Sequence, residues 1–390
     1  GCAIRVGGKR NASMASVHQD RLAFEAEYFD EVADMMRRYE VLFWPADNTV
    51  EMYNLATGKI FLKRCPLPDV SKSDFFLGNT VVVYSRHLTL VKYGDAHTER
   101  AIEASKERTL ALVKPDGYQA MGRILDIILA NGFVIAKAKL LRLSPDDAAR
   151  FYEEHASRPF YNDLVDYMSS GYVLAMELVV EGGIRKWRQL IGPTNPDVAR
   201  AESPGSIRAR YGTDATRNCC HGSDSKESAA RELDFFFGPG AQFDPVATLR
   251  ECSCAVIRPH ALRNGAAGEI IDAILEGGFT ITALKMFQLD KCAAEEFLEV
   301  YKGVVPEFMD MVNELSSGPC IAMEIRKDVE EVVPEFRKLV GPADPSIAKV
   351  LRPNTLRAKF GIDKVKNGIH CTDLPEDGVL EAEYFFRLLS

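Results

Sequence analysis

The sequence predicts an α+β protein in three parts: a small, mainly β module followed by two tandem copies of one mixed domain. Three observations lead to this prediction. The chain has 390 residues, which is more than a single hydrophobic core usually serves. Up to about residue 95, apolar and polar residues alternate as they do in strands, and beyond that point strand-like and helix-like segments follow one another. Several of these later segments then recur further along the chain, in the same order.

The first part of the chain reads as a tail and a β module. Residues 1–19 are small and polar without periodicity, so we expect a flexible tail, within which Met14 is a candidate for the native start. Residues 20–104 are predicted to form an antiparallel β module, and the charged segment Glu99–Glu107 a short helical connector. The strands expected in the module are Tyr39–Phe43, Val50–Tyr53, Ile60–Leu62, Thr80–Tyr84 and Leu88–Tyr93.

The two copies are predicted over residues 105–238 and 251–390, with a linker at 239–250. The segments TLALVKPDG, ILANGFVIAKAKLLRLS and SSGYVLAMEL of the first copy recur as SCAVIRPHA, ILEGGFTITALKMFQLD and SSGPCIAMEI in the second. So long a period indicates a duplicated domain rather than a solenoid. The elements expected in the first copy are a buried strand at Thr109–Val113, a helix at Gly122–Ala130 closed by Gly132, a strand at Phe133–Leu143 and a helix opened by Pro145.

The composition argues against several classes of function. A net charge of −8 disfavours nucleic acids and anionic membranes as main partners. No apolar run approaches the roughly 20 residues that span a bilayer, and the N-terminus lacks the apolar segment of a signal peptide. Nine cysteines at irregular spacing, including Cys252 and Cys254, suit free thiols in a reducing compartment better than disulfides or a metal site. We therefore expect a cytosolic protein.

The segment TRNCCHGSDSKESAARELDFFF, residues 216–237, contains the most reactive candidate side chain, His221. Ser223, Asp224 or Ser225 could cap the helix that follows it. A histidine placed before a capped helix is often purely structural, so the segment alone does not decide the role of His221.

Three cations favour a reactive role for this histidine. Lys114, Arg188 and Arg208 fall at predicted strand ends and loops, where ligands of α/β folds gather. A histidine among cations and hydroxyls suits attack on a phosphoryl group, because the cations neutralise the charge of the transferred group. Glu232 would fix the ring tautomer if the fold brings it close. The chain has no GxxxxGK[ST] loop, so side chains would have to hold the phosphates.

Five motifs, LVKPDG, RPFY, GPTNP, PGSIRARYG and RNCCHGSDS, make this part of the chain similar to the nucleoside diphosphate kinase family in order and approximate spacing. The resemblance covers about residues 107–238 and, more loosely, 251–390. It implies two ferredoxin-like βαββαβ domains, each with a four-stranded antiparallel sheet. It also implies ping-pong transfer of a γ-phosphate between nucleoside tri- and diphosphates through a phosphohistidine, with Mg²⁺ held through the nucleotide phosphates.

The resemblance also implies roles for residues of the first copy, where every family position is present. His221 would be the nucleophile, with Glu232 orienting its ring and Ser223 bonded to Glu232. Lys114 and Asn218 would contact the sugar hydroxyls and the transferred phosphate. The side chains that would hold or assist the phosphates are Tyr152, Arg188, Thr194 and Arg208.

Phe160 would stack on the nucleotide base and Leu164 would support it. Stacking on a ring face reads no base edge, which implies poor base selectivity. The alternative is that both residues, which follow Pro159, belong to the core.

The second copy departs from the family pattern. Arg258 replaces the family lysine, and Ala343 stands where Thr194 supplies a hydroxyl, which costs about 1.5–3 kcal/mol for one bond to a charged phosphate. Between Phe297 and Phe308 the RPF signature is absent, so neither the stacking ring nor the tyrosine can be placed. We expect a structural copy, or at most a weak nucleotide binder. The family positions that it retains are Arg337, Arg357, Asn367, His370, Thr372 and Glu381.

The segments DMMRRYEVLFWP, GKIFLKR and DFFLGNTVVVYSRHLTLVKYGD resemble a pleckstrin-homology-like module of ciliary proteins that associates with doublet microtubules. Together with two kinase-like copies, they resemble the ciliary subgroup of the family. The resemblance implies an axonemal protein with kinase activity, which binds tubulin and other axonemal proteins and has centrosomal or basal-body pools. The alternative is a structural microtubule-binding protein with little catalysis in place. A monomer with an internal dimer-like contact is expected.

Overall fold

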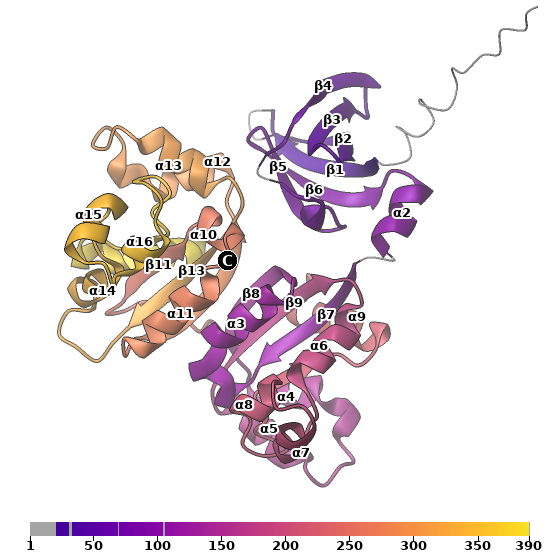
Figure 1. Cartoon of the computed structure of the whole chain (residues 1–390), viewed down its shortest axis with the longest axis vertical. Coiled ribbons are helices and arrows are strands. Elements are labelled where there is room, and N and C mark those ends of the chain that lie inside the picture. Colours follow the sequence, from indigo (N-terminus) through magenta and orange to yellow (C-terminus); the bar gives the residue numbers. More distant parts are fainter. Residues whose placement is uncertain (1–20, 31–32, 69, 104–105, 390) are drawn as a thin grey trace, which may run out of the picture. The chain divides into compact units, whose positions relative to one another are not determined.

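The computed structural model describes residues 21–30, 33–68, 70–103 and 106–389, so the tail expected over residues 1–19 lies outside the described residues. The chain forms two compact units, one ending at Lys106 and the other beginning at Glu107 (Figure 1). In the described residues, no helix is long and apolar enough to cross a bilayer.

The N-terminal unit is one antiparallel sheet of six strands in the order β4-β3-β2-β1-β6-β5, followed by a helix. Apolar residues of alternate strand positions form its core, where the rings of Phe43 and Phe75 stack with centroids 4.0 Å apart. The elements are β1 (Leu22–Asp30), β2 (Met35–Trp44), β3 (Thr49–Asn54), β4 (Lys59–Pro66), the short η1 (Lys72–Asp74), β5 (Thr80–Val83), β6 (Arg86–Tyr93) and α2 (Ala96–Glu103).

The bounds predicted for the connecting helix were wrong. The helix expected at Glu99–Glu107 is α2, which begins at Ala96 because the Asp95 carboxylate accepts a 2.7 Å hydrogen bond from the Thr98 backbone N–H. Glu107 belongs to the next strand instead, where it pairs with Val180.

The C-terminal unit contains one sheet of eight antiparallel strands in the order β10-β7-β9-β8-β12-β13-β11-β14, four from each copy. Each copy contains the four strands of the βαββαβ order that the family resemblance implied, with additional helices inserted between the second and third strands. The first copy comprises β7 (Glu107–Val113), η2 (Pro115–Ala120), α3 (Met121–Ala130), β8 (Val134–Arg142), α4 (Pro145–Phe151), η3 (Glu153–His155), α5 (Tyr161–Ser169), β9 (Tyr172–Val180), α6 (Gly183–Ile191), α7 (Pro196–Glu202), α8 (Ile207–Tyr211), β10 (Cys220–Gly222) and α9 (Lys226–Phe237).

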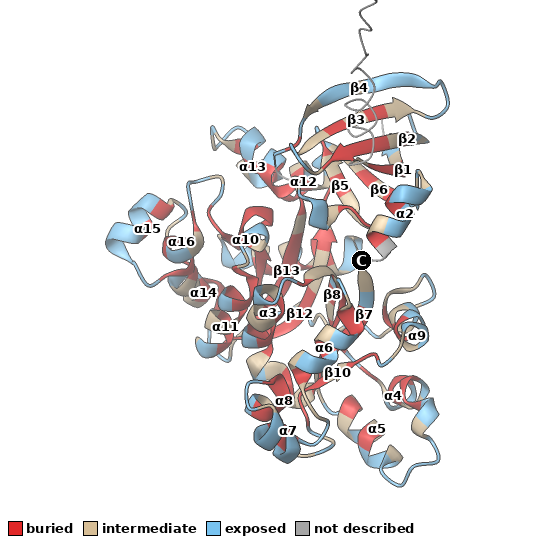
Figure 2. Cartoon of the chain, turned by 45° about the vertical axis from the view of Figure 1, so that its right-hand side comes forward, coloured by how far each residue is buried: buried red, intermediate tan, exposed pale blue. Residues whose placement is uncertain are grey.

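The second copy follows the same plan. It comprises β11 (Ser253–Ile257), α10 (Pro259–Arg263), α11 (Ala267–Glu276), β12 (Thr280–Gln288), α12 (Lys291–Phe297), η4 (Glu299–Tyr301), α13 (Phe308–Leu315), β13 (Pro319–Arg326), α14 (Val332–Val340), α15 (Pro345–Leu351), α16 (Leu356–Phe360), β14 (Ile369–Cys371), η5 (Pro375–Asp377), α17 (Gly378–Glu383) and a last turn, Tyr384–Leu388. The strands β12 and β13 of this sheet are largely buried (Figure 2).

The two copies meet along β8 and β12 and along α3 and α11. A single apolar core under α3 and α11 runs through both copies. The Tyr118 hydroxyl crosses the seam, where it donates to the Ile281 carbonyl and accepts from the Ile281 N–H, both at 2.8 Å. Arg123 pairs with Asp272 and Glu276 on α11. One chain therefore supplies the dimer-like contact that we expected.

The linker predicted at residues 239–250 contacts both copies, one near each of its ends. The ring of Phe243 stacks on that of Phe236 in α9, with centroids 5.7 Å apart and planes 12° apart. At the other end, the backbone N–H groups of Thr248 and Leu249 donate to the buried Glu324 carboxylate at 2.8 and 2.6 Å.

The seam generates a prediction at Gly122 in α3. A Cβ atom there would lie 2.5 Å from the Asp272 nitrogen and 2.6 Å from the Gly268 carbonyl oxygen. Helix propensity alone would favour alanine by up to about 1 kcal/mol, but overpacking against rigid backbone costs about 1–3 kcal/mol. Gly122→Ala should therefore lower the free energy of unfolding by about 1–2 kcal/mol in a urea titration of the full chain. Gly205→Ala is the control, because a Cβ there meets nothing within 4 Å. An unfolding midpoint raised by Gly122→Ala would contradict the tight seam.

Candidate active site

The centre of the candidate site is His221, in the short edge strand β10. Its Nε2 lies 3.1 Å from Glu232 Oε2 on α9, and Ser223 Oγ donates to the same carboxylate oxygen at 2.6 Å. Ser223 Oγ in turn accepts a 3.1 Å hydrogen bond from the Leu110 N–H of β7. The fold therefore joins His221, Glu232 and Ser223 as the sequence analysis anticipated.

Of the three capping candidates, Ser225 is the residue that caps α9. Its side chain accepts a hydrogen bond from the Ser228 N–H at 3.1 Å. Ser223 instead donates its hydroxyl hydrogen bond to the Glu232 carboxylate. Because α9 begins after Ser225, Glu232 lies two turns into the helix, on the side that faces His221.

The contact with Glu232 determines which ring nitrogen is available for chemistry. A carboxylate has only acceptor atoms, so the ring nitrogen that faces it is the one that carries a proton. Nε2 is thus held as the donor, and the free lone pair of the ring is on Nδ1. The His221 side chain is 21% exposed, so this lone pair can meet a ligand.

Lys114 and Asn218 lie beside each other, at the end of β7 and just before β10. Lys114 Nζ donates to Asn218 Oδ1 at 2.8 Å, and Asn218 Nδ2 donates to the Thr194 carbonyl at 3.0 Å. Burial, followed by the positive charge of Arg208, lowers the pKa of Lys114 to about 8. A buried ammonium that a second cation destabilises is well placed to receive an anion.

The remaining predicted phosphate-binding side chains surround this group. Arg208 donates to the Gly192 and Cys220 carbonyls at 2.8 and 2.9 Å, while its Nε has no protein partner within the described structure. The buried Tyr152 hydroxyl is likewise without one, and its ring lies edge-on to His221 at 6.2 Å. Arg188 lines a cavity of about 780 Å³ together with Asp224. Unsatisfied buried donors are costly unless a ligand or water completes them.

The structure separates the two residues predicted to hold the base. Phe160 is 46% exposed, so it is a surface ring rather than a core residue. Leu164 is buried among apolar side chains on α5, beneath that surface. The exposed ring is available for stacking, whereas Leu164 is part of the core.

Several positioning contacts were not anticipated from the sequence. The Trp187 indole N–H donates to the His221 carbonyl at 3.1 Å, and the Phe151 ring lies edge-on to His221 at 5.4 Å. The Asp116 carboxylate accepts from the Cys219 N–H at 3.0 Å and from the Tyr167 hydroxyl. No spacing rule connects residues so far apart in sequence, although Asp116 lies within the LVKPDG motif.

The second copy repeats the histidine geometry. His370 Nε2 lies 2.9 Å from Glu381 Oε2, and Thr372 donates to the same oxygen at 2.8 Å. Arg357 donates to the Ile369 and Gly341 carbonyls as Arg208 does in the first copy. The His370 side chain, however, is only 4% exposed, so the retained histidine is buried.

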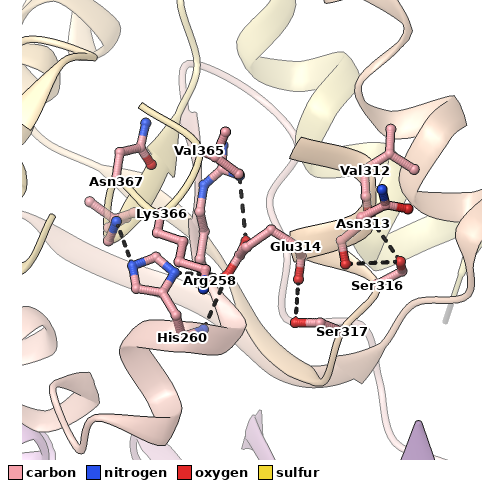
Figure 3. A network of polar contacts seen from close by, with 12 residues as sticks. Arg258, His260, Val312, Asn313, Glu314, Ser316, Ser317, Val365, Lys366 and Asn367 are labelled. Carbon is pink, nitrogen blue, oxygen red and sulfur yellow. Dashed lines mark hydrogen bonds and ion pairs between the residues drawn. The ribbon is translucent and has the colours of Figure 1, made fainter. Parts of the chain in front are cut away.

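A buried ionic network replaces the lysine site of the second copy (Figure 3). Arg258 NH1 lies 3.6 Å from Glu314 Oε2, and His260 Nδ1 lies 2.7 Å from Glu314 Oε1. Although burial raises it, these partners hold the pKa of the Glu314 carboxyl below its usual value. Asn367 Oδ1, whose counterpart accepts from Lys114, has no protein partner in the described part of the chain. The guanidinium of Arg258, which replaces the lysine of the first copy, is therefore paired with the carboxylate of Glu314 inside the protein.

A second carboxylate of the second site, Asp373, also has partners within the protein. This carboxylate pairs with Arg337 and accepts a 2.6 Å hydrogen bond from the Tyr301 hydroxyl. At the positions matching Tyr152 and Phe160 stand Leu298 and Glu307, so the structure places the substitutions that the sequence alone could not. Neither can stack on a base or donate to a phosphate.

Comparison with known proteins agrees with this geometry. A family model described as nucleoside diphosphate kinase matches residues 107–241 and 251–389. The chain is 48% identical over 372 residues to "Nucleoside diphosphate kinase homolog 7" of Rattus norvegicus. The matched segment covers 95% of this chain and 94% of that protein. It is 36% identical to "Thioredoxin domain-containing protein 6" of Xenopus laevis, over 72% of this chain and 43% of that protein. A "Nucleoside diphosphate kinase" of Aquifex aeolicus is 47% identical over 34% of this chain and 94% of its own length.

The matched residues include both histidine sites and all the strands of the eight-stranded sheet. The chain belongs to the nucleoside diphosphate kinase family.

Proposed function

We propose that the first copy transfers the γ-phosphate of a nucleoside triphosphate to a nucleoside diphosphate through phospho-His221. The observation that carries this proposal is the fixed and open imidazole of His221, protonated toward Glu232 and flanked by the Lys114 and Arg208 cations. A neutral histidine with one free lone pair is a nucleophile, and the cations offset charge on the phosphoryl oxygens.

In the first half-reaction, Nδ1 of His221 attacks the γ-phosphorus, and the bond to the bridging oxygen breaks, so the nucleoside diphosphate leaves with that electron pair. Glu232 stabilises the cationic ring that results, through the Nε2 proton. A second nucleoside diphosphate then attacks the phosphohistidine and restores the neutral ring. Mg²⁺, held through the nucleotide phosphates, would neutralise part of their charge.

The two-cation pocket with unsatisfied Arg208 and Tyr152 donors fits the phosphates of such a substrate. The exposed ring of Phe160 would stack on the base, which accounts for an enzyme that accepts several bases. We propose that the second copy contributes little transfer, since the His370 side chain is only 4% exposed and Arg258 is paired with Glu314.

The first prediction from this mechanism concerns the phosphorylated residue. Incubation with γ-labelled ATP and Mg²⁺ should label the protein through an acid-labile, base-stable bond. His221→Asn should abolish the label and nearly all phosphotransfer, because no other group here offers a path of similar barrier. His370→Asn is the matched control and should keep both. If His370→Asn removes the label instead, the second copy is the active one.

A second prediction uses the low pKa of Lys114. An anionic ligand raises this pKa on binding, so above pH 8 the free protein must take up a proton when it binds. The dissociation constant for ADP with Mg²⁺, measured by titration calorimetry, should be flat from about pH 7 to 8. It should then rise by up to tenfold per pH unit.

Lys114→Arg should flatten this slope, because arginine stays charged throughout the range. A wild-type profile that stays flat to pH 9.5 would show that Lys114 is not the anion-binding group.

For the cellular role, we propose an axonemal protein of the cilium or flagellum that binds on or inside doublet microtubules and has centrosomal or basal-body pools. The N-terminal unit supports this proposal, because its sequence resembles the pleckstrin-homology-like module of such proteins and it folds as one sheet with a C-terminal helix. It also exposes large apolar residues, which suit a docking surface: Phe29, Met35, Met36, Ile60 and Phe61.

The second candidate role is mainly structural, and the buried His370 of the second copy favours it. We propose tubulin and other axonemal proteins as partners, and a monomer in solution, since the dimer-like contact is made within one chain.

A third prediction separates the two units. A chain that begins at Ser105 should fold and keep phosphotransfer near the level of the full chain, because no site residue precedes Lys114 and the units divide at Lys106. Its incorporation into axonemes, measured as occupancy against the full chain, should fall sharply. Normal occupancy of the shortened chain would instead assign the lattice contacts to the kinase copies.

A further inference from the structure

The helix α15 of the second copy exposes an apolar stripe (Figure 2). Its residues Ile347, Val350 and Leu351 are 48, 79 and 70% exposed. They stand at positions i, i+3 and i+4, so they share one face of the helix. Ala348, on the opposite side, is fully buried and packs the helix on the rest of the copy. The stripe is therefore presented to solvent by a helix that is already folded and fixed.

The matched helix of the first copy has the same geometry and a different surface. Both α7 and α15 have seven residues, and each is capped by the side chain of the residue before it. At the positions of Val350 and Leu351, however, α7 has Ala201 and Glu202. Since the first copy forms this helix without the two apolar side chains, the fold does not require them. Large exposed apolar residues that folding does not require mark a surface that binds something else.

The surface around α15 is basic. Residues 344–366 contain six cationic side chains and two carboxylates, a net charge of +4, whereas the matched residues 195–217 of the first copy contain four and three, a net charge of +1. The whole chain has a net charge of −8. Arg352, Lys359 and Lys366 are exposed, and within the described residues no carboxylate pairs with any of them. A basic region on an acidic protein attracts a partner of negative charge.

Arg352 places a cation at the end of the apolar stripe. It follows Leu351 directly and lines a cavity of about 390 Å³. The cavity is also lined by Arg337 and Lys338, which are each paired with a carboxylate of the protein. The guanidinium of Arg352 is thus available to a carboxylate from outside, which it can hold through two parallel hydrogen bonds. The matched residue of the first copy is Ser203, which carries no charge.

We propose that α15 and the basic surface after it form a docking site for an acidic amphipathic helix of another protein. The apolar side chains of that helix cover Val350 and Leu351, and one of its carboxylates binds Arg352. Apolar residues at helical spacing are those by which one amphipathic helix packs on another, and the cations select a partner with acidic flanks. This docking does not require phosphotransfer by the first copy.

The test uses three fluorescein-labelled synthetic peptides of one heptad pattern on the full chain, titrated by fluorescence anisotropy. The first has leucine at the apolar positions and glutamate at the flanking ones, the second has serine in place of leucine, and the third has lysine in place of glutamate. The first peptide should bind at a single site at least tenfold more tightly than either of the others. Raising the salt concentration should weaken its binding, because salt screens the ion pairs.

Two variants introduce the residues of the first copy and should therefore fold. Val350→Ala with Leu351→Glu should weaken binding of the first peptide at least tenfold, and Arg352→Ser should weaken it severalfold. Both should keep the phosphotransfer activity and the unfolding midpoint of the wild type. The reverse exchange in α7, Ala201→Val with Glu202→Leu, is the matched control. It builds the stripe without the basic surface and should add no second site for the peptide.

The proposal is overturned if the three peptides bind alike, if none of them binds, or if the double variant in α15 binds the first peptide as well as the wild type does. Two other occupants would also overturn it. Flotation with phosphatidylserine vesicles that the double variant abolishes would assign the stripe to a membrane surface. Dimerisation in sedimentation that the double variant abolishes would assign it to a second copy of this chain.

Discussion

The close approach of α3 and α11 is the contact on which the C-terminal unit depends. Gly122 and Gly268 allow the two helix backbones to touch, and the shared core beneath them draws residues from both copies. Once the helices are fixed, β8 and β12 lie edge to edge and the two four-stranded sheets become one. Burial of an otherwise exposed strand edge also removes a site of unwanted pairing.

The same seam lets the two copies diverge. Because the core is shared, ligand-facing positions of the second copy can change while that copy still supports the first. The backbone geometry around His370 is kept, as the Glu381 and Thr372 contacts show. Among the groups that would meet a nucleotide, the lysine, the threonine, the tyrosine and the stacking ring have been replaced. The arginine that replaces the lysine, Arg258, is paired with Glu314 inside the protein.

These replacements agree with the cost of leaving charges buried. An unpaired buried guanidinium would destabilise the fold by several kcal/mol, and an ion pair offsets part of that cost. Arg258 has such an ion pair with Glu314, although its Nε and NH1 make no hydrogen bond within the described residues. In the first copy, Lys114 and Arg208 lie close together, and burial, followed by the charge of Arg208, lowers the pKa of Lys114. The first copy therefore keeps an electrostatic cost that an anionic ligand would relieve, whereas the second copy pairs Arg258 with a carboxylate of the protein.

The sequence by itself determined the duplication, the β character of the N-terminal unit and most elements of the first copy, because these depend on local periodicity and turn residues. The family motifs also identified His221, Glu232 and Ser223, which the fold brings together. Local signals misplaced the connecting helix, since an aspartate cap set its start. Only the tertiary structure decided which residues act through long-range contacts: Trp187 on the His221 backbone and the Arg258–Glu314–His260 network. These contacts join residues distant in sequence, and burial sets their energies, so no local pattern could specify them.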